Sequence, residues 1–323
     1  MSDLQKPLPS GFLRTTTAEE ALGASLVGKR VLITGGYSGI GLETARVLSA
    51  AGASLVIPAR DVAKATAALR DFPYTEVFFM DLGDPDSIDG FARGLVTSGL
   101  ALDLLIANAG IMATPLSRDA RGYERQFATN HLGHFQLVSR LWPALLRAER
   151  ARVVVLSSGA HRFSDIDFLD PNYQRRAYDR WKAYGQSKTA NALFAVALDQ
   201  RGKSAGVRAY SVHPGSIETD LQRHLTLADL QAMGFRDADG NIPPAIAARY
   251  KTVPQGAATT VWCATSAQLD DRGGVYCEDC DIAVAMPADA TEMRGVLPWA
   301  TDLGRADQLW ELSEALTETP FSI

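Results

Sequence analysis

Hydrophobic positions along the chain fall into short continuous runs, separated by longer stretches with helical spacing. The short runs, expected to be strands, are "RVLIT" (30–34), "ASLVIP" (53–58), "EVFFM" (76–80), "DLLIA" (103–107), "RVVVLS" (152–157), "VRAYSV" (207–212) and "GVYC" (274–277). Unbroken apolar runs are typical of parallel strands covered on both faces. Helical patterns lie near 40–51, 61–70, 86–98, 122–149, 180–203 and 255–266. This alternation predicts an α/β fold with right-handed crossovers and a doubly wound parallel sheet.

Three segments lie outside the alternation. Residues 1–25 are expected to form an irregular N-terminal extension, and residues 216–252 a long insert ahead of a helix that starts near Pro254. Residues 302–318 predict an amphipathic C-terminal helix with Leu309, Leu312 and Leu316 on one face. Because the sequence contains no internal repeat and no low-complexity linker, residues 26–323 are predicted to be a single domain.

Composition narrows the class of protein. The 323 residues carry a net charge of −5 and form no basic cluster, which argues against nucleic acid as a partner. Every apolar run ends well short of the roughly 18 residues that a membrane span needs, and the N-terminus does not have the apolar core of a secretory signal. Cys263, Cys277 and Cys280 predict neither a disulfide framework nor a metal site, although the last two have C-x-x-C spacing. The prediction is a soluble cytoplasmic protein.

A glycine-rich stretch follows the first predicted strand. Gly35, Gly39 and Gly41 of "TGGYSGIG" (34–41) have the spacing G-x-x-x-G-x-G and open the first helix. Glycine accepts positive φ and carries no Cβ, so a turn built from it lets backbone amides approach a diphosphate. The helix that follows adds the positive end of its dipole. Its position between a strand and a helix predicts a dinucleotide site.

The end of the second strand bears on which dinucleotide is bound. A carboxylate there would accept hydrogen bonds from the ribose 2′-hydroxyl of NAD, but the sequence has Ala59 followed by Arg60. Arginine suits a 2′-phosphate, so NADP(H) is favoured over NAD(H). Asp61 is left with two interpretations, a helix N-cap or a group that repels the phosphate.

Candidate acid–base chemistry comes from "YGQSK", which places Tyr184 and Lys188 one helical turn apart on one face. A nearby ammonium favours the phenolate and is expected to lower the pKa of the tyrosine, which makes it a general acid or base for an alcohol or carbonyl oxygen. Ser157 and Ser158 end a strand at the carboxyl edge of the sheet, where ligands bind in open α/β folds. Asn130 lies inside a predicted helix, either to bind a water at a kink or to satisfy neighbouring backbone.

Taken together, these motifs resemble the short-chain dehydrogenase/reductase family and its Rossmann fold over residues 29–285. The signatures occur in family order: "TGGYSGIG", "DL" (81–82), "NAG" (108–110), "NHLGHF" (130–135), "SS" (157–158), "YGQSK" (184–188) and "HPG" (213–215). The resemblance implies a catalytic tetrad of Asn130, Ser158, Tyr184 and Lys188, in which Ser158 is preferred to Ser157 and Asn130 anchors a water. It also implies nucleotide contacts from Gly35, Tyr37, Ser38, Gly39, Ile40, Gly41, Arg60, Asp81, Leu82, Asn108, Ala109, Gly110, Tyr184, Lys188, Pro214, Gly215 and Thr219.

Within these contacts, the resemblance assigns the adenine side to Asp81, Asn108 and Gly110, and the nicotinamide to Pro214, Gly215 and Thr219. "NHLGHF", the "ARD" after the second strand and the long gap between Ser158 and Tyr184 are similar to the retinol dehydrogenase-like branch. Residues 165–183, which fill that gap, either wall a substrate pocket with aromatic side chains or only pack the insertion down.

The insert at 216–252 is expected to be a substrate lid, with Leu225, Leu227, Leu230, Met233 and Phe235 as its apolar face. The predicted function is hydride transfer between NADP(H) and an alcohol or carbonyl of a hydrophobic or bulky small molecule. Reduction of a carbon–carbon double bond and a non-catalytic dinucleotide sensor remain as alternatives. The substrate, the direction and stereochemistry of the reaction, and the oligomeric state stay open, and a homo-oligomer is in keeping with the family.

Overall fold

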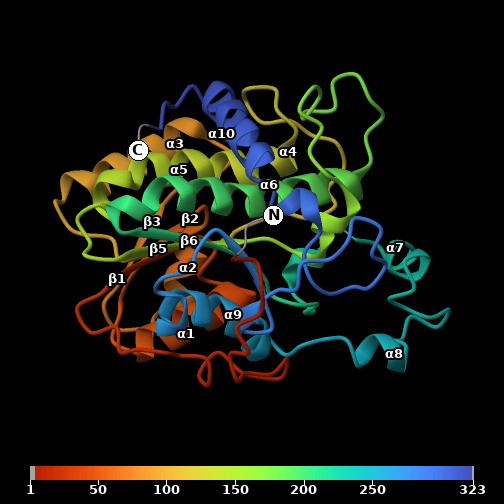
Figure 1. The fold of residues 1–323 in the computed structure, drawn as a ribbon, viewed down its shortest axis with the longest axis horizontal. Helices are drawn as coiled ribbons and strands as arrows, with labels where there is room; N and C mark the ends of the chain where they lie inside the picture. Colours follow the sequence, from red (N-terminus) through yellow and green to blue (C-terminus); the bar gives the residue numbers. More distant parts are fainter. Residues whose placement is uncertain (1–3, 224, 322–323) are drawn as a thin grey trace.

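The structure is a computed structural model that describes residues 4–223 and 225–321. Residues 1–3 of the predicted N-terminal extension, residue 224 of the predicted lid and residues 322–323 at the end of the predicted domain lie outside the described residues. Figure 1 shows a central sheet with a layer of helices on each side and a small helical excursion at one end.

The sheet has eight strands in the order β3-β2-β1-β4-β5-β6-β7-β8. All neighbouring pairs are parallel except β7 and β8. The strands are β1 (Arg30–Ile33), β2 (Ser54–Ala59), β3 (Thr75–Phe79), β4 (Leu104–Ala107), β5 (Ala151–Leu156), β6 (Val207–His213), β7 (Val275–Glu278) and β8 (Asp281–Ile282). The doubly wound parallel sheet predicted from the apolar runs is confirmed. The order reverses between β1 and β4, and in such folds ligands bind at that switch point.

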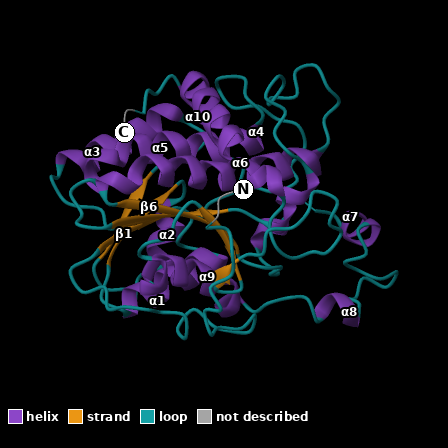
Figure 2. Ribbon diagram, viewed as in Figure 1, coloured by secondary structure: helices purple, strands orange, loops and turns teal. Residues whose placement is uncertain are grey.

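Helices cover both faces of the sheet, as Figure 2 shows. One face carries α3 (Pro85–Thr97), α5 (Gly133–Leu145), α6 (Arg180–Gly202) and α10 (Leu303–Thr317), and the other carries α1 (Gly39–Ala50), α2 (Val62–Ala68) and α9 (Val253–Thr265). The short helices are α4 (Arg125–Phe127), α7 (Leu227–Ala232) and α8 (Pro244–Ala247). Every residue of β5 is buried, as expected for a strand between two helical layers. Among the described residues, no helix is long and apolar enough to cross a bilayer.

The helix predicted over 122–149 is interrupted. A π-helical turn at Ala128–Leu132 separates α4 from α5, and the Gly133 amide donates to the Ala128 carbonyl five residues back. Such turns occur often at functional sites, and this one carries Asn130.

The "CEDC" motif is part of a hairpin that the sequence analysis did not predict. Asp279 and Cys280 have φ of 51° and 57° and join β7 to β8, which is the geometry of a type I′ turn. The three cysteines are buried free thiols.

The terminal segments pack against this core. Residues 4–25 contain no described helix or strand, yet Gln5 is buried against the hairpin, where its amide pairs with both the amide (2.9 Å) and the carbonyl (2.9 Å) of Tyr276. On α10, Leu309 is buried, and Leu312 and Leu316 pack partly buried against the same core cluster.

Candidate active site

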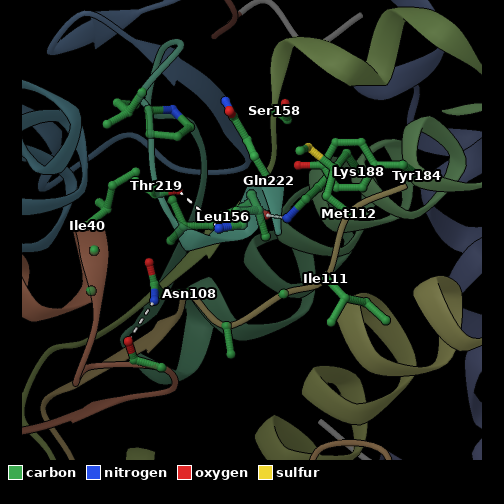
Figure 3. A pocket seen from close by; sticks show the side chains of 18 of the residues that line it. Ile40, Asn108, Ile111, Met112, Leu156, Ser158, Tyr184, Lys188, Thr219 and Gln222 are labelled. Atoms are coloured by element: carbon green, nitrogen blue, oxygen red, sulfur yellow. Dashed lines mark hydrogen bonds between the residues drawn. The ribbon is translucent and has the colours of Figure 1, made fainter. Parts of the chain in front are cut away.

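A cavity of 560 Å³ opens at the carboxyl ends of the parallel strands. It is lined by all the residues predicted to contact the nucleotide: Gly35, Tyr37, Ser38, Gly39, Ile40, Gly41, Arg60, Asp81, Leu82, Asn108, Ala109, Gly110, Tyr184, Lys188, Pro214, Gly215 and Thr219. Ser158 lines it as well, whereas Asn130 is buried behind the wall. Figure 3 shows Ile40, Asn108 and Thr219 on one side of the cavity and Tyr184 and Lys188 on the other.

The glycine turn has the geometry that a dinucleotide requires. Gly35 and Gly39 have φ of +67° and +52°, which disfavour any residue with a Cβ. A Cβ on Gly41 would lie 2.3 Å from the Gly35 carbonyl oxygen, so the helix can approach the strand only at glycine. All residues of α1 are described. The Ser38 side chain at its N-cap makes no capping hydrogen bond, and its first turn holds no acidic residue. The free amides and the positive dipole end therefore fit a diphosphate.

The cavity carries two cationic side chains where β2 leads into α2. Arg60 and Lys64 both line it, and Ala59 is buried at the end of β2. Asp61 is the N-cap of α2, and its carboxylate accepts a hydrogen bond of 2.9 Å from the Lys64 amide. The structure thus decides between the two interpretations of Asp61 in favour of the N-cap. Lys64 was missed because nothing in the sequence shows that the first turn of α2 faces the cavity.

The acid–base residues meet where α6 passes the end of β5. Tyr184 and Lys188 are 4% exposed, and the Lys188 ammonium donates to the Leu156 carbonyl at 2.9 Å (Figure 3). The Lys188 nitrogen lies 5.7 Å from the centre of the Tyr184 ring. Ser157 and Ser158 both line the cavity, but the Ser157 hydroxyl donates to the Lys188 carbonyl at 2.7 Å, whereas Ser158 is a hydrogen-bond partner of Tyr184. This placement favours Ser158 over Ser157 as the residue that meets a substrate.

The pKa values of this pair differ from the expectation. Burial raises the pKa of Tyr184 to about 12, opposed by the hydrogen bond with Ser158. Burial also lowers the pKa of Lys188 to about 8. The expectation of a lowered tyrosine pKa is therefore wrong for the free protein. Loss of hydration dominates, and the ammonium is directed at a backbone carbonyl rather than at the phenol oxygen.

Asn130 is held by the protein itself. Its Oδ1 accepts from the Ile111 amide at 2.9 Å, and its Nδ2 donates to the Ile111 carbonyl at 2.9 Å and to the Ser187 hydroxyl at 3.0 Å. Both Nδ2 hydrogens are used. Of the two roles considered for Asn130, the structure therefore shows hydrogen bonding to neighbouring backbone groups. Asn130 ties the end of β4 to the residue that precedes Lys188.

The insert at 216–252 contributes both apolar and charged side chains to the cavity, including Arg223 and Arg249. Its nonpolar lining residues include Leu225, Leu230, Met233 and Phe235, and Met112, Phe163, Trp181 and Met293 line the cavity from elsewhere in the chain. Leu227 of the insert does not line the cavity. It is 53% exposed, because it faces outward from α7. Arg180 at the start of α6 forms an ion pair with Asp229 of α7 and so connects the insert to α6.

The insertion at 165–183 contributes little to the cavity. Trp181 lines the cavity, whereas Tyr173 and Tyr178 pack on each other, with their ring centres 5.2 Å apart. The Tyr178 hydroxyl donates to the Thr114 carbonyl at 3.0 Å. For most of these aromatic residues, packing is the role that the structure shows.

Three histidines, His134, His161 and His213, bond groups next to the site, whereas a fourth, His131, bonds Ser313 of α10. His131, His134, His161 and His213 all have pKa values lowered by burial, to between about 3 and about 4. His161 Nδ1 bonds the Ser158 carbonyl at 2.9 Å, and His213 Nδ1 accepts from the Gly159 amide at 3.0 Å. No common spacing relates His134, His161 and His213 in the sequence, so only the fold brings them to the site.

Comparison with known proteins gives the class. Residues 29–229 match the family model described as short chain dehydrogenase. A "Probable oxidoreductase" of Streptomyces lividans is 44% identical over 88% of this chain and 96% of its own length. Human "Retinol dehydrogenase 12" is 38% identical over 89% of this chain and 86% of its own. A crystal structure of an uncharacterized protein from Mycobacterium Paratuberculosis superposes with a TM-score of 0.72 at 33% identity, covering 95% of this chain and 100% of that one.

The chain therefore belongs to the short-chain dehydrogenase family, in its retinol dehydrogenase-like branch. Membership makes it an oxidoreductase that depends on a nicotinamide dinucleotide.

Proposed function

We propose that this protein transfers a hydride between NADP(H) and the carbon of an alcohol or carbonyl group in a hydrophobic or bulky small molecule. The observation that carries the proposal is one continuous cavity. It joins a glycine turn suited to a diphosphate, the Ser158–Tyr184–Lys188 group, and a set of large nonpolar side chains that includes Phe163, Trp181 and Phe235. When bound, the nicotinamide supplies or accepts the hydride, and the protein has to manage the proton on the substrate oxygen.

Tyr184 moves that proton. With a pKa raised to about 12 it carries its proton at neutral pH, which suits donation to the oxygen of a carbonyl substrate. Ser158 donates a hydrogen bond to the same oxygen and holds it in line. Lys188, whose ammonium lies 5.7 Å from the Tyr184 ring centre, stabilises the phenolate that forms.

Asn130 and the insert act without contacting the reacting atoms. Asn130 fixes Ile111 and Ser187, so it keeps the end of β4 and the turn before Lys188 in position. The insert at 216–252 acts as the lid, because its apolar side chains close the cavity and exclude water from the hydride path.

The preference for NADP(H) is supported by charge. Arg60 and Lys64 line the cavity, and the carboxylate that lies between them in the sequence, Asp61, is used as a helix cap. Two cations there favour a 2′-phosphate over a 2′-hydroxyl. We expect the variant R60A/K64A to lose most of its preference for NADPH over NADH. A tenfold preference corresponds to about 1.4 kcal/mol, which two ionic contacts can supply.

The test is a panel of apolar aldehydes, ketones, alcohols and enones, followed at the absorbance band of the reduced nicotinamide with NADPH and with NADH. Y184F should abolish turnover and leave NADPH affinity nearly unchanged, because the phenol oxygen acts on the substrate and the ring is retained. Turnover by Y184F at the wild-type rate would refute the assignment. A product reduced at the carbon–carbon bond, or tight NADPH binding without any turnover, would replace the proposal by one of the alternatives.

A further inference from the structure

One buried side chain links the nucleotide turn to the turn that carries Asn130. His134, in the first turn of α5, is 0% exposed. Its Nε2 lies 2.9 Å from the Thr34 hydroxyl at the end of β1, and its Nδ1 lies 2.9 Å from the Asn130 carbonyl in the π-helical turn. The imidazole therefore spans two elements that the reaction needs together.

The protonation of this link follows from its partners. A carbonyl oxygen can only accept, so Nδ1 carries the hydrogen and Nε2 is the acceptor. The Thr34 hydroxyl has one proton, and Nε2 at 2.9 Å is a better acceptor for it than the Ile106 carbonyl at 3.4 Å. Both nitrogens of the neutral His134 ring therefore have a hydrogen-bond partner.

Thr34 is in turn part of the nucleotide site. Its hydroxyl oxygen accepts from the Asn108 and Ala109 amides at 3.0 Å each, which uses both lone pairs. The Asn108 side chain donates back to the Thr34 carbonyl at 2.9 Å and lines the cavity beside Gly35. The orientation of the Thr34 hydroxyl therefore helps to set the wall against which the adenosine side would rest.

The other end of the link reaches the catalytic helix. Asn130 is bonded to Ile111 and to Ser187, the residue before Lys188. Gly110 lies between them and the cavity: a Cβ there would sit 3.2 Å from Asn130 Oδ1 and 3.7 Å from the Lys188 nitrogen. A shift of the π-helical turn would therefore displace Gly110, which lies next to the Lys188 nitrogen in the cavity wall.

We infer that His134 is a positioning residue that holds the nucleotide turn and the Asn130 turn in register, through its bonds to Thr34 and the Asn130 carbonyl. The inference rests on the proposed function for its consequence on turnover, whereas its consequence on nucleotide affinity does not depend on it.

Three variants test this. H134L removes both bonds, H134Q keeps one donor and one acceptor at similar reach, and H131L is the matched control. His131 is an equally buried histidine three residues earlier, but it bonds Ser313 of α10 at 2.7 Å rather than the nucleotide turn. NADPH affinity is measured by fluorescence titration and stability by thermal melting, and turnover is measured with the substrate selected by the panel.

We expect H134L to bind NADPH about tenfold more weakly, equivalent to about 1.4 kcal/mol, and to lose turnover as well. H134Q should regain part of both. H131L should melt at a lower temperature to a similar extent and keep the wild-type affinity. If H134L does not fold, the pair H134Q and H134N replaces it, because asparagine is too short to reach both partners.

Equal NADPH affinity of H134L, H131L and the wild type would overturn the inference, and so would an equal loss in both variants. If the wild type binds NADPH but reduces nothing in the panel, the proposed function fails. The difference in affinity between H134L and H131L still decides the role of His134.

Discussion

Lys188→Met is expected to inactivate this protein and, at the same time, to stabilise it. The Lys188 ammonium is buried, and its pKa is lowered from 10.5 to about 8 by the loss of hydration. That difference corresponds to about 3.4 kcal/mol by which the folded state disfavours the charged form at neutral pH. Methionine has a similar length and no charge to desolvate.

The stability lost with the hydrogen bond of Lys188 is small. Lys188 donates to the Leu156 carbonyl at 2.9 Å, but the same carbonyl also accepts from Asn191 Nδ2 at 2.9 Å, so it stays paired in the variant. Losing one hydrogen bond costs about 1 kcal/mol. The free energy of unfolding of K188M should therefore exceed that of the wild type by about 2 kcal/mol at pH 7.

The gain should depend on pH. The folded lysine releases its proton near pH 8 and the unfolded lysine near 10.5, so the unfolded state binds more protons between these values and wild-type stability rises with pH there. The advantage of K188M is full below pH 8 and shrinks above it. Urea unfolding at pH 7.0, 8.5 and 9.5 measures this change.

Lys251→Met provides the matched control. Lys251 is also a buried lysine, but its nitrogen lies 2.6 Å from a carboxylate oxygen of Asp279. Removing it breaks an ion pair, and the variant should be less stable than the wild type. A K188M protein no more stable than the wild type at pH 7, or one whose advantage does not decline above pH 8, would refute the reasoning.

Three further predictions concern the turn, the lid and the histidines. G41A should abolish NADPH binding in a titration and lower the melting temperature, because its Cβ would lie 2.3 Å from the Gly35 carbonyl oxygen; unchanged binding would contradict the fit. R180Q, which breaks the ion pair with Asp229 in α7, should raise KM more than it lowers kcat, and a selective fall in kcat would contradict a lid role. The buried histidines have lowered pKa values, so each should withdraw about 1.4 kcal/mol of stability for each pH unit below 6.5. Melting temperatures measured from pH 7.5 to 4.5 should fall, and a flat profile would show that these rings are not held neutral.

Much of the fold could be predicted because burial on both faces leaves parallel strands as unbroken apolar runs. "RVVVL" in β5 is such a run, and it was confirmed. The β7–β8 turn at Asp279 and Cys280 could not be predicted, because the aspartate is followed by cysteine rather than by the glycine that marks such turns. The π-helical turn at Ala128–Leu132 was not specified beyond the kink considered at Asn130, because five residues are too few for a changed helical repeat to show in the hydrophobic pattern.

The candidate site shows the same division. The glycine turn, Tyr184 and Lys188 are predictable because local geometry and spacing alone define their chemistry. Lys64 and His134 are not, since each reaches the site through a helix orientation that depends on tertiary packing. The pKa of Tyr184 was misjudged because sequence spacing reports a charged neighbour and says nothing about burial.

The base of the insert is closed by its own backbone. The Lys251 amide donates to the Ser216 carbonyl at 2.8 Å, and Ser216 pairs with Tyr250, so the chain leaves and rejoins the core at a single point. A segment with adjacent ends can be lengthened, shortened or exchanged at little entropic cost. The part of this segment beyond Thr219, which lines the cavity, can therefore vary in evolution or be grafted without altering Ser158, Tyr184 or Lys188.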